Sequence, residues 1–136
     1  MTALTTDRDT VSRLGLRRTL GAAAGALIFA GAIAVRNAAG YAAPGSTALG
    51  LAALGISPER VDNTGGADGD LPVNAVAGIF KVANSADADA ITAADIGATC
   101  YLVDDQTVAK TDGTGTRSPA GEVFDVDADG VWVKFG

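Results

Sequence analysis

Alternation of apolar and polar side chains is clearest in residues 78–85, which read Gly-Ile-Phe-Lys-Val-Ala-Asn-Ser. Successive side chains of an extended chain point to opposite faces of a sheet, so Phe80 and Val82 share one face and Ile79 and Lys81 share the other. Loops rich in turn-forming and small residues flank this segment on both sides. We therefore expect a central strand with one face in the core and the other facing solvent or a partner.

The end of the chain shows the same alternation twice. Phe124 and Val126 alternate with Asp125 and Asp127, and a second alternating run covers residues 131–135. The sequence Ala-Asp-Gly between the two runs is typical of a tight turn. This pattern predicts a β-hairpin in which Phe124 and Val126 share one face.

Shorter runs of the same kind are separated by Gly, Pro, Asn and Asp. Residues 27–35 and 41–43 are expected to form a hairpin around a turn at 37–40. Residues 47–56 are compatible with a strand or, given their Ala and Leu, a helix, and we choose the strand. Further strands are expected at 60–61, at 71–82 (one strand, or two broken at Gly78), and at 99–103 and 107–110 around a turn at 104–106. One helical turn is expected at 92–95, capped by Thr92 and ended by Gly97. Residues 112–119 are expected to form a Gly/Thr-rich loop.

These elements predict an all-β protein, a small β-barrel or sandwich of short antiparallel strands with an extended N-terminal arm and at most one short helical turn. The arm is assigned to residues 1–20 and a single β-domain to residues 21–136. The core is expected to be thin, because the chain of 136 residues has only seven aromatic side chains and is rich in Ala and Gly. Support from a partner subunit would suit such a core.

The net charge of −6 is unevenly distributed. Residues 1–40 contain five Arg and two Asp, which gives +3 and leaves −9 for the rest. An acidic body repels nucleic acid, since phosphate binding needs clustered Lys and Arg, so no nucleic acid is expected as a ligand. The arm could instead meet an acidic protein surface or be a solvated terminus. The candidate partner-binding residues are Arg8, Arg13, Arg17 and Arg18.

The chain has no histidine and one cysteine, Cys100. A disulfide within the chain, a Cys/His zinc site and a Ser/His or Cys/His catalytic pair are therefore excluded. Cys100 lies in an apolar run and is expected to be a small buried residue. We expect no catalytic residue, no cofactor and no metal ion.

Acidic and glycine-rich motifs offer only weak alternatives to this expectation. Residues 125–130 match the opening of a calcium loop, but the twelfth position falls on Gly136 and no helices flank it, which favours a hairpin turn. The pairs Asp104/Asp105 and Asp68/Asp70 are more typical of solvated turns than of acid–base catalysis. Residues 111–117 lack the phosphate-loop pattern and indicate a surface loop.

Arg17 and Arg18 precede an uncharged run that ends at Val35, a pattern that resembles a twin-arginine export signal. Residues 32–34 would even provide a cleavage site. The run is interrupted by glycines and, at 17 residues from Thr19, is short for a membrane span, so we expect no membrane segment. An exported bacterial β-domain is the alternative, and the hairpin interpretation is preferred.

An ordered series of segments resembles small structural proteins of tailed bacteriophages, the capsid decoration or cement proteins. The series covers roughly residues 25–135, and its weight rests on the common order because no single piece is diagnostic. The first 24 residues do not match a family pattern. The matching segments are residues 25–31, 37–41, 61–66, 78–85, 94–97, 103–109 and 131–133.

The resemblance implies a non-enzymatic β-domain that binds the outer surface of a phage head and ties neighbouring capsid subunits together. The implied partners are the major capsid protein and neighbouring copies of the chain, by analogy as a homotrimer. A thin core suits this role, since attachment to a lattice adds stability and repeated weak contacts give avidity. The arm is predicted to become ordered only on a neighbouring subunit.

Overall fold

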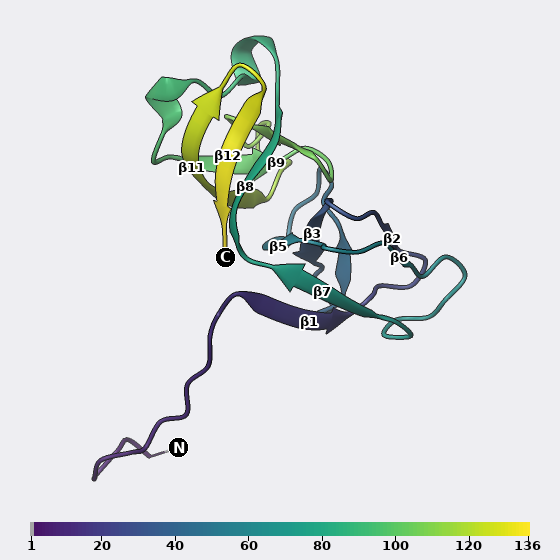
Figure 1. Cartoon of the computed structure of the whole chain (residues 1–136), viewed down its shortest axis with the longest axis vertical. Helices are drawn as coiled ribbons and strands as arrows, with labels where there is room; N and C mark the ends of the chain where they lie inside the picture. Colours follow the sequence, from purple (N-terminus) through teal and green to yellow (C-terminus); the bar gives the residue numbers. More distant parts are fainter. Residues whose placement is uncertain (1) are drawn as a thin grey trace.

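The computed structural model describes residues 2–136, and its strands gather into a body from which residues 2–16 extend as an arm (Figure 1). The architecture of this part is nearly all β, with strands and two single-turn 3-10 helices. The strands are β1 Arg17–Gly21, β2 Leu27–Ile28, β3 Ile33–Arg36, β4 Ala42–Pro44, β5 Ala52–Ile56, β6 Val61–Asp62, β7 Pro72–Val76, β8 Gly78–Asn84, β9 Thr99–Leu102, β10 Thr107–Ala109, β11 Pro119–Asp127 and β12 Gly130–Phe135, and the helices are η1 Asp87–Asp89 and η2 Ala93–Asp95.

The first half of the chain builds a five-stranded antiparallel sheet in the order β1-β7-β5-β3-β4, and β2 pairs with β6 as a separate ribbon. Ala22, directly after β1, forms a parallel bridge with Ala42 at the start of β4. The core of this sheet consists mainly of small side chains. Its buried members are Ala22, Ile28, Ala32, Ala34, Ala42, Leu54, Val61, Val73 and Ala75.

The second half forms a closed five-stranded barrel in the order β10-β8-β12-β11-β9. β8 lies between β12, with which it is antiparallel, and β10, with which it is parallel, so the expectation of a central strand is confirmed. Val82 is buried and Phe80 packs against the barrel core, whereas Ile79 and Lys81 are exposed on the outer face. The alternation in the sequence therefore assigns the two faces of this strand correctly.

The two halves join where β7 passes into β8 through Ala77. Ile33 and Val35 of β3 pack in the barrel's core cluster, so the packing of the two halves is continuous. Gly55 in β5 lies against the end of β7, with a φ of 143°. A Cβ at this position would overlap the carbonyl oxygen of Val76, so only glycine fits at this crossing, where β5 meets the end of β7.

The predicted hairpins are confirmed. The turn at residues 37–40 joins β3 to β4, with the Asn37 N–H donating to the Tyr41 carbonyl. The C-terminal hairpin joins β11 to β12, and β9 pairs with β10 around residues 103–106. The run 71–82 is two strands, and the break falls at Ala77, one residue before the expected Gly78.

Several expected boundaries are corrected. The predicted strand at 27–35 is interrupted at residues 29–32, where Gly31 has a φ of 85°, and the strand predicted at 47–56 begins only at Ala52. A helical turn follows Thr92 as predicted, with a capping box to Asp95. The turn η1 is additional, so there are two helical turns where at most one was expected.

The boundary between arm and body lies earlier than predicted. Residues 17–20 were assigned to the arm, but they belong to β1, which pairs with β7 from Arg17 opposite Val76 to Gly21 opposite Pro72. The Leu16 carbonyl accepts a hydrogen bond of 2.7 Å from the N–H of Ala77 and extends this pairing by one residue. The sequence around residues 17–20 gives no sign of this strand, because its partner strand lies more than fifty residues further along the chain.

Candidate functional site

The four arginines predicted to bind a partner do not form one cluster. Arg8 and Arg13 lie in the arm, whereas Arg17 and Arg18 open β1. All four are exposed, and none forms an ion pair within residues 2–136. Because side chains alternate along a strand, Arg17 and Arg18 point to opposite faces of the sheet.

The arm itself is neutral, which corrects the expectation of a basic arm. Residues 2–16 contain two arginines, Arg8 and Arg13, and two aspartates, Asp7 and Asp9, so their net charge is 2 − 2 = 0. The excess positive charge lies where the arm meets the sheet, in Arg17 and Arg18. The net positive charge of the N-terminal region therefore lies at the base of the arm.

Apolar side chains along the arm are exposed. Leu4, Val11, Leu14 and Leu16 have 72%, 94%, 86% and 60% of their surface accessible. Leu20 of β1 packs partly against the core of the sheet, whereas Arg18, two residues earlier on the same face, is exposed, and the chain bends at residues 15–16. The apolar side chains of the arm are therefore exposed on a bent segment and do not continue the core-facing row of β1.

β1 pairs with β7 along its whole length, and its other side is unpaired except at its C-terminal end, where Ala22 forms a parallel bridge with Ala42 of β4. The backbone hydrogen bonds of Leu16 with Ala77 and of Ala22 with Leu71 fix the register. The even-numbered residues of β1 therefore form the backbone hydrogen bonds to β7. The backbone groups of Arg17 and Thr19 therefore face away from β7 at an unpaired edge, whereas the Ala22–Ala42 bridge covers that edge beside Gly21. Such an edge is a template for a further strand from another chain.

The acidic C-terminal turn is organised by protein groups. Asp127 accepts hydrogen bonds from the N–H groups of Asp129 and Gly130 and from the Trp132 indole, and it lies 3.2 Å from the ammonium of Lys81. The backbone bond from Asp129, followed by the bond from Trp132, lowers the pKa of Asp127 below its ordinary value. Within residues 2–136 no group of three or more acidic or cysteine side chains is placed to hold a metal ion. The hairpin interpretation of residues 125–130 is confirmed.

The Gly/Thr-rich loop 111–117 packs against η1. Arg117 forms an ion pair of 3.3 Å with Asp89, and its guanidinium also donates to the Thr111 carbonyl. The hydrogen bond from Thr111, and then Arg117, holds the pKa of Asp89 below its ordinary value. Arg117 therefore links this loop to η1.

The other residues singled out in the sequence have local roles. Asp70 and Asp104 each accept a hydrogen bond from a backbone N–H of their own turn, and Asp68 accepts one from the N–H of Ala24, 44 residues earlier in the chain. Cys100 is fully buried in the barrel, as predicted, and burial raises the pKa of its thiol to about 11. Among the described residues, no helix has the length and hydrophobicity needed to cross a bilayer.

Phe124 is a surface residue that the sequence pattern misplaces. The alternation puts it on the same face as Val126, yet it is 55% exposed. Between Val123, which pairs with Val133, and Asp125, which pairs with Trp132, Phe124 has no partner on β12. This β-bulge adds one residue to β11 and turns the Phe124 side chain outward.

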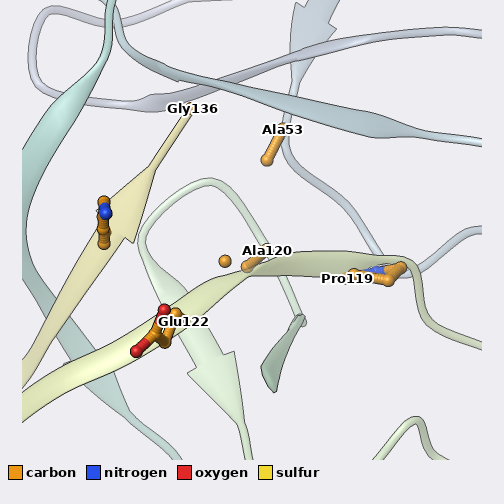
Figure 2. Close-up of a pocket in the computed structure, with 7 residues that line it drawn as sticks. Ala53, Pro119, Ala120, Glu122 and Gly136 are labelled. Atoms are coloured by element: carbon orange, nitrogen blue, oxygen red, sulfur yellow. The ribbon is translucent and has the colours of Figure 1, made fainter. Parts of the chain in front are cut away.

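A hollow of about 350 Å³ opens beside β11, where the barrel meets β5 (Figure 2). Small residues form most of its wall, and Glu122 and Lys134 are its charged members. Its lining consists of Ala53, Pro119, Ala120, Gly121, Glu122, Lys134 and Gly136.

Comparison with protein-family models, with curated proteins and with solved structures finds no match.

Proposed function

We propose that this chain is a structural protein of a phage virion, a capsid decoration protein that binds the outer surface of the head and stabilises contacts between major capsid subunits. The proposal rests on the ordered resemblance of the sequence to cement proteins. It is supported by one structural observation, the exposed arm that leads directly into the open edge of β1. An extended segment on a compact body can reach a subunit beyond the one that the body contacts.

The arm and the β1 edge support this role through their chemistry. Exposed leucines and valine offer apolar contacts, the outward backbone groups of β1 offer hydrogen bonds, and Arg17 and Arg18 offer positive charge. An acidic, extended segment of a capsid subunit would match all three by adding a strand to the sheet. Ordering the arm costs roughly 1–2 kcal/mol of backbone entropy per residue, so the contacts must be extensive.

The decisive experiment adds the purified chain to phage heads stripped of their decoration protein. Binding with a Kd at or below about 1 μM and a higher disruption temperature of the heads would support the proposal, because a bound ligand stabilises the state that it binds. Deletion of residues 2–15 should weaken attachment while the body stays folded. Absence of binding by the intact, folded chain would refute the proposal.

Replacing both Arg17 and Arg18 by alanine sharpens the same experiment. Loss of two exposed charges should weaken attachment most at low ionic strength, where screening is least. The double variant of Arg8 and Arg13 is the matched control, since it removes the same charge from the neutral arm. Equal salt dependence of the two double variants would contradict the assignment of the charge contact to the base of the arm.

The export alternative makes a different prediction for the mature protein. Cleavage after Ala34 would remove Ile28 and Ile33, which are fully buried in the two cores. Mass spectrometry of the protein isolated from its source distinguishes an exported protein from a virion protein. A chain that begins after Ala34 or Ala43 would favour export, and a chain that retains its N-terminal residues would favour the virion protein.

A further inference from the structure

The outer face of β11 carries a protruding aromatic side chain close to a hollow of suitable size. Phe124 is held outward by the bulge between Val123 and Asp125, and more than half of its surface is accessible. A single exposed apolar side chain is common on a protein surface, so the exposure of Phe124 carries weight only together with the bulge and the neighbouring hollow. A bulge that redirects one apolar side chain is typical of a functional feature of a strand.

The hollow begins two residues away on the same strand, at Glu122. Its wall contains Ala53, Ala120 and Gly121, which have little or no side chain, and its volume of about 350 Å³ has room for an aromatic ring. Figure 2 shows Ala120 and Glu122 on β11 and Ala53 on the neighbouring segment around this opening. The exposed Phe124 ring, the knob, and the hollow therefore lie within a few residues of each other along β11.

The charges around the hollow are complementary. Glu122 and Lys134 are opposite each other in the β11–β12 ladder, yet they form no ion pair within the described residues. Both are exposed at the rim of the hollow. A surface that carries one acidic and one basic group beside an apolar knob and its hole is complementary to a copy of itself.

We propose that this face binds a second copy of the chain, with Phe124 of each protomer inserted into the hollow of a neighbour and Glu122 facing the neighbour's Lys134. A reciprocal contact gives a dimer, and a head-to-tail contact gives a ring where the rotation between copies closes and a filament where it does not. The proposal concerns the purified protein alone and is independent of any capsid. It goes beyond the proposed function, and either can fail without the other.

The first test measures the mass of the full chain by sedimentation velocity over a range of concentrations. The intact chain should associate, and Phe124→Asp should raise the dissociation constant at least about tenfold, as expected for a central anchor. Phe29→Asp is the matched control, because Phe29 is also half exposed but lies between β2 and β3, outside this face. A chain that stays monomeric at all concentrations, or equal effects of the two variants, would overturn the proposal.

The second test uses charge reversal and does not depend on the knob. Glu122→Lys and Lys134→Glu should each weaken self-association, because like charges then meet across the contact. Mixing the two variants should restore it, since the lysines of one chain then face the glutamates of the other. Asp112→Lys, an exposed reversal in the 111–117 loop, should neither weaken association nor be rescued. Failure of the mixture to associate, with both chains folded by circular dichroism, would refute the predicted pairing.

Discussion

The two halves of the molecule stabilise their strands in different ways. In the barrel every strand has neighbours on both sides, and one alanine occurs among the twelve residues of its buried cluster. In the sheet β1 is open on one side, and five of the nine buried residues are alanines. Larger side chains bury more apolar area, so each core residue contributes more free energy of folding in the barrel than in the sheet. The comparison identifies the barrel as the stable body and the sheet as the half with the open edge.

The largest expected effect comes from the barrel core. Phe135 is 2% exposed and packs near Phe80, with ring centres 6.5 Å apart. Phe135→Ala should lower the free energy of unfolding by about 3–5 kcal/mol. Val73→Ala in the core of the sheet removes two carbons and should cost about 1.5 kcal/mol. Urea unfolding of both variants tests the comparison, and an equal loss would contradict it.

The crossing at Gly55 should give the next largest effect. Its φ of 143° and the overlap of an added methyl group with the Val76 oxygen predict that Gly55→Ala costs roughly 1–3 kcal/mol. Gly15→Ala is the control, because nothing lies within 4 Å of that position. Thermal unfolding of the two variants measures the difference. A Gly55→Ala protein as stable as the unaltered chain would show that the sheet can shift to admit the methyl group.

The acidic turn of the barrel should give a pH-dependent effect. The folded-state pKa of Asp127 lies below its ordinary 3.8, so its contribution to stability is complete above that pH and is lost as pH falls through the folded-state pKa. The stability difference between the unaltered chain and Asp127→Ala should therefore be larger at about pH 6 than at about pH 2.5. Asp127→Asn keeps an acceptor for the Asp129 N–H and should show an intermediate loss at neutral pH. A difference that is independent of pH would exclude a role for the carboxylate charge.

The smallest effect on stability is expected at the arm. Deletion of residues 2–15 removes exposed side chains and leaves the Leu16–Ala77 hydrogen bond in place, so the melting temperature should be unchanged. Calorimetry of the two proteins provides the measurement. A clear drop would mean that the arm packs on the body in solution.

Local patterns in the sequence predicted much of this architecture because they depend on neighbouring residues. The alternation around Phe80 and the Ala-Asp-Gly turn identify β8 and the last hairpin. Phe124 was misplaced because alternation assumes an uninterrupted ladder, and a bulge shifts the side chains by one position. Gly31 interrupts a run that composition alone makes continuous.

The candidate site was predicted in part, for the same reason. The arginines could be identified from charge alone, but their division between arm and strand depends on β7. Pairing over such a separation leaves no local signal in the sequence. The combination of Phe124 with a hollow requires β5 and β11 to meet, which likewise becomes visible only in the folded chain.

One-sided pairing of β1 gives this strand an alternating pattern of amide hydrogen exchange. The N–H groups of Leu20 and Arg18 are bonded to β7, whereas those of Arg17 and Thr19 face the open edge. Pro72, which has no N–H, lies opposite Gly21 at a position where no hydrogen bond is lost. Deuterium should therefore enter every second residue of β1 rapidly, while the barrel strands exchange slowly. If a partner adds a strand here, the fast amides alone should become slow, so exchange at single-residue resolution would report occupation of this edge.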